Sequence, residues 1–291
     1  MRLSAFAKIN WSLDITGVRE DGYHLMDMLM QPISLADEIE LSPLFSEEIR
    51  LTTGGYPPCR ADEHNLAYRA AEALKKATGF PLGVSIHVEK QIPIGAGLGG
   101  GSADAAGVLF GLNRLWETGL SGAELESIGL TLGADVPFCL RGGLARTTGI
   151  GENLKAVPNK YCYWLIVVQP CHGLKTGEVF QLWRDGPELR HPDTDAAETA
   201  LREGSLTDLC DGIGNVLEPV ASRLRPEIPQ AIRELRNAGA LRAVMTGSGS
   251  AVFGIFQSSV LAEKAWRQLR TRWRNTFLCH TQQDSIRILS E

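Results

Sequence analysis

The stretch PIGAGLGGGSADAA, residues 93–106, carries the pattern that decides the fold of this chain. Five glycines lie between Gly95 and Gly101. Because glycine reaches positive φ at little cost, consecutive N–H groups here can turn inward and form a concave anion site. The run SADAAGVLFGLNRLW, residues 102–116, predicts a helix whose first turn adds unpaired N–H groups and a positive dipole end. A glycine-rich loop that leads into a helix N-terminus is typical of a phosphate-binding site.

Three other interpretations of this loop fit the sequence less well. Gly95, Gly97 and Gly100 satisfy the dinucleotide pattern G-x-G-x-x-G, which should follow a strand directly and lead to a second strand with an acidic end. Here charged residues and a proline separate the strand-like run 84–88 from the glycines, and residues 121–133 predict another helix. A Walker P-loop needs G-K-[ST] after the glycines, which is missing. A flexible linker is disfavoured because an apolar strand precedes the loop and an apolar-periodic helix follows it.

Composition and charge limit the class of protein. A chain of 291 residues exceeds the usual size of one domain and predicts two lobes, and 44% hydrophobic with 22% charged residues is typical of a globular protein. A net charge of −5 argues against a general nucleic-acid surface. Since no apolar stretch approaches the roughly 18 residues of a membrane span, we expect no membrane association. The first ten residues also lack the apolar core of a signal peptide.

The cysteines indicate a reducing environment. They are scattered and form no C-x-x-C pair, whereas disulfide scaffolds are short and cysteine-dense and zinc sites need close ligand pairs. We therefore expect reduced thiols in a cytoplasmic protein. Its expected oligomeric state is a monomer or a weak homodimer. The six residues are Cys59, Cys139, Cys162, Cys171, Cys210 and Cys279.

Periodicity along the chain predicts mixed helix and strand content in both halves. Strand-like runs fill the first 53 residues, at 2–8, 11–17, 25–34, 37–43 and 49–53. A helix is predicted from about Asn65, and Ser121 with Glu124 forms a capping box that begins another. The boundary between the lobes is predicted near residue 155, which gives a first lobe of residues 1–155 and a second of residues 156–291.

The loop is similar to the P-x-x-x-G-L-G-[SG]-[SG]-[SA] signature of the galactokinase, homoserine kinase, mevalonate kinase and phosphomevalonate kinase (GHMP) superfamily. Within it, GLGGGSADAA resembles the version in kinases that act on 4-diphosphocytidyl-2-C-methyl-D-erythritol in the non-mevalonate isoprenoid pathway. Three more segments carry the resemblance: AKIN…GVREDGYH in residues 7–24, GADVPF in 133–138 and MTGSGSAVF in 245–253. The resemblance spans nearly the whole chain. It implies a two-lobed α+β GHMP kinase fold, with an N-terminal lobe like ribosomal protein S5 domain 2 and a ferredoxin-like C-terminal lobe.

The resemblance implies that the glycine-rich loop binds the phosphates of ATP, with Mg²⁺ carried by the nucleotide. Ser102 either caps the helix, binds phosphate or lies near Mg²⁺, and these alternatives stay open. Asp104 is expected to complement the helix dipole. Asn65 and Lys90 resemble residues on the adenine side of the site. The alternatives are that Asn65 only caps a helix and that Lys90 is only a solvated surface lysine. The predicted ATP-binding residues of the loop are Pro93, Gly95, Ala96, Gly97, Leu98, Gly99, Gly100, Gly101 and Ser102.

Phosphoryl transfer also needs a base near the acceptor hydroxyl. Asp135 is the candidate, with an N-cap before Pro137 as the structural alternative. By resemblance, Lys8 pairs with this aspartate, and a nearby ammonium would keep the carboxylate ionised. Asn10, two residues along the same strand, shares the face of Lys8 and is expected to bind the acceptor.

The acceptor's cytidine group needs a flat apolar slot with polar groups at its edge. By resemblance, Tyr23 stacks on the base, His24 reads its edge and Phe180 covers the opposite face. Thr176 is expected nearby as a polar contact, although the aromatic residues could instead belong to the core. In the loop TGSGS, Gly247 and Ser248 are predicted either to meet the acceptor or to pack against the phosphate loop.

Together these residues predict ATP-dependent phosphorylation of the 2-hydroxyl of 4-diphosphocytidyl-2-C-methyl-D-erythritol. Two rival functions remain. One is another small-molecule kinase of the superfamily, acting on homoserine, mevalonate or a sugar, against which the AKIN…GYH pair argues. The other is a catalytically silent metabolite-binding module, which would have no reason to keep both Lys8 and Asp135.

Overall fold

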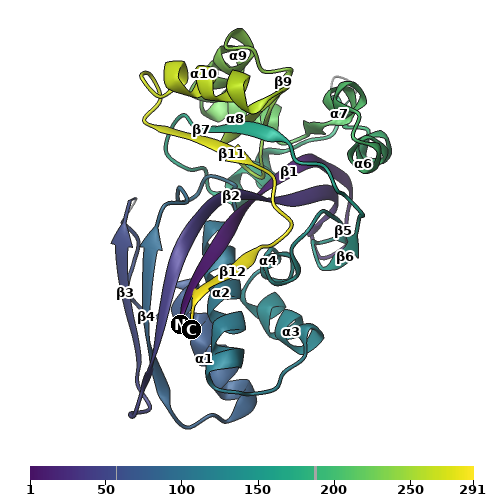
Figure 1. Ribbon diagram of the computed structural model, residues 1–291. Helices are drawn as coiled ribbons and strands as arrows, with labels where there is room; N and C mark the ends of the chain where they lie inside the picture. The colour runs from purple at the N-terminus through teal and green to yellow at the C-terminus, as the bar shows by residue number, and fades with distance from the viewer. Residues whose placement is uncertain (57, 187–188) are drawn as a thin grey trace.

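Two long antiparallel strands, β1 (Arg2–Val18) and β2 (His24–Leu44), run through the middle of the molecule (Figure 1). The computed structural model describes residues 1–56, 58–186 and 189–291. Each strand joins two runs that the sequence predicted as separate. The register of β1 on β2 shifts between Phe6 and Lys8 and again between Asn10 and Ser12. Such bulges interrupt the alternation of side chains without ending the strand, which is why the pattern suggested breaks.

The first sheet grows outward from these two strands. Its main path has the order β12-β1-β2-β4-β3, with β5 paired to β2, β6 paired to β5, and β8 parallel to β1. The last strand of the chain thus pairs with the first, while the lobe boundary near residue 155 stays a prediction. The remaining strands are β3 (Ile49–Gly55), β4 (Gly83–Lys90), β5 (Ala145–Gly149), β6 (Asn153–Ala156), β8 (Gly214–Asn215) and β12 (Ile286–Ser290).

Helices cover one face of this sheet. Among them α2 lies directly against β1 and β2, since a Cβ on its Gly111 would stand only 2.4 Å from Cδ1 of Leu41. Asn65 accepts a hydrogen bond from the N–H of Ala67 and so caps α1, and the capping box of Ser121 and Glu124 at α3 is confirmed. The four helices are α1 (Leu66–Thr78), α2 (Gly100–Leu115), α3 (Gly122–Leu132) and α4 (Val136–Arg141).

A second, antiparallel sheet of order β11-β7-β10-β9 forms the other end of the molecule, with α9 and α10 beside it (Figure 1). Its strands are β7 (Trp164–Gln169), β9 (Arg242–Met245), β10 (Val252–Phe256) and β11 (Asn275–His280). The helices of this half are α5 (Thr176–Leu182), α6 (Thr194–Glu203), α7 (Leu206–Gly212), α8 (Glu218–Leu224), α9 (Glu227–Asn237) and α10 (Ser259–Leu269).

Trp11 joins the two sheets. It is fully buried in β1 and makes edge contacts to Tyr163 and Phe253 of the second half, with ring centroids 5.5 and 5.6 Å apart. Its indole N–H donates to Oε1 of Gln31 at 2.8 Å, so the polar end of the ring is also satisfied. Because a buried aromatic pair adds attraction beyond its area, this contact fixes the two halves against each other.

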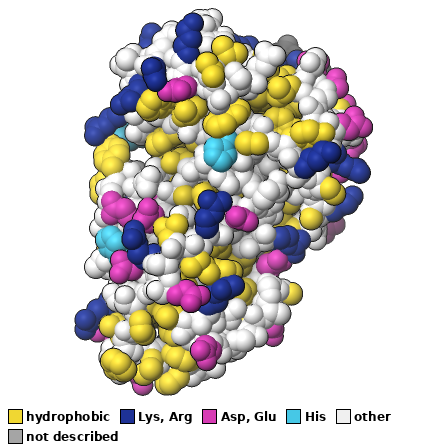
Figure 2. Space-filling view, viewed as in Figure 1, with side chains coloured by type: hydrophobic (Ala, Val, Ile, Leu, Met, Phe, Trp, Pro, Cys, Tyr) yellow, Lys and Arg dark blue, Asp and Glu magenta, His cyan; other side chains and the backbone are white. Residues whose placement is uncertain are grey.

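The surface and the thiols are ordinary for a globular protein. On the face shown in Figure 2, acidic and basic side chains lie interspersed. All six cysteines are free thiols. None of the helices in the described ranges combines the length and the apolar character that crossing a membrane requires.

Candidate active site

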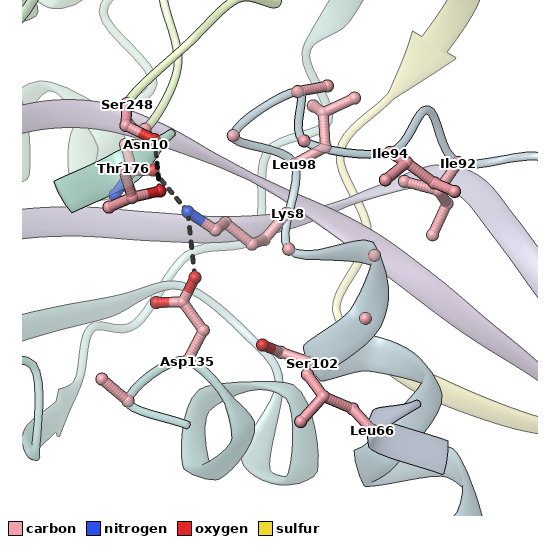
Figure 3. Close-up of a pocket in the computed structure, with 18 of the residues that line it drawn as sticks. Lys8, Asn10, Leu66, Ile92, Ile94, Leu98, Ser102, Asp135, Thr176 and Ser248 are labelled. Atoms are coloured by element: carbon pink, nitrogen blue, oxygen red, sulfur yellow. Dashed lines mark hydrogen bonds and ion pairs between the residues drawn. The ribbon is translucent and has the colours of Figure 1, made fainter. Parts of the chain in front are cut away.

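One cleft of about 1010 Å³ collects the residues that the sequence assigned to a site (Figure 3). It lies where the glycine-rich loop, β1, the beginning of β2 and the beginnings of α4 and α5 meet. Every predicted site residue lines it. These are Lys8, Asn10, Tyr23, His24, Asn65, Lys90, Pro93, Gly95, Ala96, Gly97, Leu98, Gly99, Gly100, Gly101, Ser102, Asp135, Thr176, Phe180, Gly247 and Ser248.

The glycine-rich loop has the conformation expected of an anion site. Gly95, Gly97 and Gly99 have φ of +66°, +79° and +71°, values that other residues adopt only with strain. Gly99 is the N-cap of α2, and no side chain of the described residues caps this helix. Ser102 lies inside the first turn, so it is not the cap, and its side chain extends toward the part of the cleft that holds Asp135 (Figure 3). The N–H groups at the start of α2 are therefore left for a ligand.

Backbone contacts hold this loop in place from two sides. The N–H of Lys8 donates to the carbonyl of Leu98 at 3.0 Å, and the N–H of Ala251 donates to the carbonyl of Ala96 at 3.0 Å. The second glycine loop, residues 246–250, packs directly against the first, since a Cβ on Gly97 would stand 2.3 Å from the carbonyl oxygen of Thr246. The packing alternative for TGSGS is thus confirmed, and Gly247 and Ser248 still line the cleft.

An ion pair stands at the centre of the cleft. Nζ of Lys8 lies 3.4 Å from Oδ2 of Asp135 and donates to Oδ1 of Asn10 at 2.7 Å (Figure 3). Asp135 occupies the N-cap position of α4, yet its carboxylate makes no capping hydrogen bond there. The side chain of Lys8 is 5% exposed and that of Asp135 is 34% exposed. A buried ammonium therefore holds a carboxylate whose free edge faces the cleft, an arrangement suited to binding and deprotonating a hydroxyl.

Aromatic side chains gather at the other end of the cleft. The ring of His24 lies 5.2 Å from that of Phe180 and 5.7 Å from that of Trp183, centroid to centroid. Burial, and then the charge of Arg184, lower the pKa of His24, so the ring is neutral at pH 7. Tyr23 is 60% exposed at the rim. The hydroxyls of Thr176 and Ser248 are 2.9 Å apart and tie α5 to the second glycine loop.

Sequence reasoning missed two residues that shape the site. Trp183 holds one side of His24, and its position three residues after Phe180 on a helical segment is the signal that could have found it. Asn215 donates to the carbonyls of Met245 and Gly247 at 2.9 and 2.8 Å and so holds the second glycine loop. No local pattern marks Asn215, because its role depends on the pairing of β8 with β1 far along the chain.

Lys90 and Asp104 differ from the sequence expectations, because Lys90 is buried and Asp104 pairs with it. Lys90 is 4% exposed, not solvated, and its ammonium bonds to Asp37 and, at 2.7 Å, to Asp104. Asp104 lies beyond the first turn of α2 and is buried in this ion pair, so complementing the helix dipole is not its main interaction. Asn65 caps α1 with its oxygen and gives its amide N–H to the carbonyl of Arg60 at 2.6 Å.

The family model for the GHMP kinases N terminal domain matches residues 65–143, and the model for the GHMP kinases C terminal matches residues 197–275. A homoserine kinase from Cytophaga hutchinsonii has the same fold, with a TM-score of 0.76 at 17% identity over 99% of this chain and 97% of the other. The fold and the cleft thus define a GHMP kinase.

More similar proteins narrow the family. The 4-diphosphocytidyl-2-C-methyl-D-erythritol kinase of Bacillus pumilus (strain SAFR-032) is 42% identical over 91% of both chains. A crystal structure of 4-(cytidine 5'-diphospho)-2C-methyl-D-erythritol kinase superposes with a TM-score of 0.83 at 37% identity, covering 97% of this chain and 99% of the other. The chain belongs to the 4-diphosphocytidyl-2-C-methyl-D-erythritol kinase family.

Proposed function

We propose that this protein transfers the γ-phosphoryl group of ATP to the 2-hydroxyl of 4-diphosphocytidyl-2-C-methyl-D-erythritol, a step in the non-mevalonate route to isoprenoid precursors. The single observation that carries the proposal is the Lys8–Asp135 pair beside an uncapped helix N-terminus in one cleft. The names of the relatives supply the acceptor, and the aromatic end of the cleft suits its cytidine group.

The chemistry follows from the positions of these groups. The N–H groups of the glycine-rich loop and the first turn of α2 bind the β- and γ-phosphates. Asp135 takes the proton of the acceptor hydroxyl while the oxygen bonds to the γ-phosphorus, and the bond from that phosphorus to the β–γ bridging oxygen breaks. ADP leaves with the electron pair of the broken bond. Lys8 steadies the carboxylate and offsets the negative charge that gathers between acceptor and phosphate.

We propose that Mg²⁺ enters the cleft with the nucleotide. Among the described residues no three His, Cys, Asp or Glu side chains gather as a metal site. Mg²⁺ at nucleotide sites is commonly held by phosphates, waters and one or two protein groups. Ser102, at the start of α2 and facing Asp135, is the side chain we assign to this role (Figure 3). When bound, the ion neutralises part of the phosphate charge.

The two ends of the cleft divide the substrates between them. We assign Asn65 to the adenine side, where it lies at the beginning of α1. At the far end, Tyr23 and Phe180 are assigned to the faces of the cytosine and the neutral ring of His24 to its edge. Asn10, Thr176, Gly247 and Ser248 are assigned to the middle of the acceptor, between the base and the reacting hydroxyl.

A coupled assay of ADP release tests the proposal. Purified protein is given ATP and Mg²⁺ with 4-diphosphocytidyl-2-C-methyl-D-erythritol, with homoserine, with mevalonate or with no acceptor. We expect ADP release with the cytidyl substrate at a rate at least about 100-fold above the others, and phosphorus NMR of the product should place the new phosphate on the 2-hydroxyl. A higher rate with homoserine or mevalonate, or no release with any acceptor, would contradict the proposal.

A further inference from the structure

A buried ion cluster lies beside the phosphate loop and takes no part in the chemistry above. Lys90, the last residue of β4, places its ammonium between the carboxylates of Asp37 on β2 and Asp104 on α2. These residues are 4%, 0% and 4% exposed, respectively. Buried charges are costly to bring out of water, so three of them at one point need a reason beyond stability.

The hydrogen bonds of Asp37 reach the segment that leads into the loop. Its Oδ2 accepts from the ammonium of Lys90, and its Oδ1 accepts from the N–H of Gln91 at 2.6 Å and from the N–H of Ile92 at 2.8 Å. The glycine-rich loop begins immediately afterwards, at Pro93. One carboxylate thus fixes the backbone where the chain runs into the loop.

Asp104 holds the other end of the same loop. It lies on α2, the helix into which the loop leads, and its Oδ2 accepts from Lys90 at 2.7 Å. The two ends also touch directly, since a Cβ on Gly100 would stand 2.9 Å from Cγ2 of Ile92 and 3.5 Å from Nζ of Lys90. The seven residues from Pro93 to Gly99 are therefore closed at their base by one cluster.

We propose that the Asp37–Lys90–Asp104 cluster is a positioning device: it sets the spacing between the start of the phosphate loop and the N-terminus of α2, and so aligns the N–H groups that bind the nucleotide's phosphates. This inference rests on the proposed function only in taking the ligand of the loop to be a nucleotide. Lys90 then acts through the two aspartates and not by touching the phosphates, because its side chain is only 3% exposed.

The net charge of the cluster indicates that it positions the loop and does not attract the phosphates. Two carboxylates and one ammonium sum to a negative charge, which opposes a polyanion nearby. In the described residues Oδ1 of Asp104 has no hydrogen-bond partner, and its Oδ2 accepts from the ammonium of Lys90.

Calorimetric binding of ADP and of adenosine to purified variants tests the inference. Asp37→Ala removes the acceptor for two backbone N–H groups and should lower ADP affinity at least about tenfold. Adenosine affinity and the KM of the cytidyl acceptor should stay within about twofold, since neither depends on the phosphate loop. Asp37→Asn, which keeps one accepting oxygen, should lose only about threefold for ADP. Asp27→Ala is the matched control, because Asp27 lies on the same strand in an ion pair with Arg146.

Each possible result of these binding measurements either supports or overturns the inference. Unchanged ADP affinity in Asp37→Ala, or equal losses for ADP, adenosine and acceptor, would overturn the inference. If Asp37→Ala does not fold, Asp37→Asn and Asp104→Asn decide. An unchanged ADP affinity in Asp37→Asn overturns the inference, and so does a tenfold gain in Asp104→Asn, which would mean that charge dominates. ADP binding needs neither the acceptor nor Asp135, so failure of the proposed reaction remains distinguishable from failure of this inference.

Discussion

Replacing Gly97 by alanine should damage the kinase by forcing apart the two glycine loops. Gly97 has φ of +79°, and a Cβ at this position would stand 2.3 Å from the carbonyl oxygen of Thr246 and 3.1 Å from the N of Gly249. Both neighbours are backbone atoms in a loop that Asn215 holds by two hydrogen bonds, so the clash has no flexible side chain to absorb it.

The size of the effect follows from these distances. Restoring an ordinary contact of 3.4 Å requires the loops to separate by about 1 Å. The left-handed conformation adds about 1–2 kcal/mol of strain for a residue with a Cβ. Because a misplacement of about 1 Å at a reacting centre can lower the rate about 100-fold, we expect a loss of that order in kcat/KM for ATP.

The assay is steady-state ADP release, with thermal unfolding measured in parallel. Gly119→Ala is the matched control, because Gly119 has φ of +72° but nothing within 4 Å of its Cβ position. It carries the same backbone strain without the clash and should keep near-normal kcat/KM. If Gly97→Ala retains the activity of Gly119→Ala, the two loops do not set the geometry of the phosphate site and the reasoning is refuted.

Three further changes test other parts of the account. Lys8→Met should lower kcat about 100- to 1,000-fold with ADP affinity nearly unchanged, as calorimetry can check, because it removes the charge beside Asp135. Phe180→Ala should raise the KM of the cytidyl acceptor about 5- to 150-fold, from a stacking loss of about 1–3 kcal/mol, whereas exposed Leu182→Ala should not. Asp104, with its pKa raised to about 7, keeps a proton that the unfolded chain releases above about pH 4. As pH rises from 5 to 7, the free energy of unfolding of the unaltered protein in urea should therefore fall by up to about 1.4 kcal/mol per pH unit more than that of Asp104→Asn. Equal pH dependence in both proteins would contradict this.

The local features of the fold could be predicted from the sequence because they depend on near neighbours. The glycine-rich loop, the capping box at Ser121 and the helix that begins after Asn65 are each set by a few adjacent residues. Long-range pairing was not visible in the same way. The strand β12 was missed because its partner, β1, lies at the other end of the chain.

In the candidate site too, local features were predictable from the sequence and long-range contacts were not. The glycine-rich motif and the resemblance to the kinase family gave the candidate site residues, and all of them line the cleft. The sequence did not indicate that Lys90 is buried between Asp37 and Asp104, since those partners are 53 and 14 residues away along the chain. From the sequence alone, a lysine before a loop is predicted to be solvated, because the carboxylates that bury it come from distant parts of the chain.

The single-turnover rate of Asp135→Asn, with ATP and the cytidyl acceptor both saturating, tests the central claim most directly. Asparagine keeps the shape of the side chain but cannot take a proton from the acceptor hydroxyl. We expect a rate at least about 100-fold below that of the unaltered protein, with ADP affinity within about twofold. A rate close to that of the unaltered protein would contradict the assignment of Asp135 as the base.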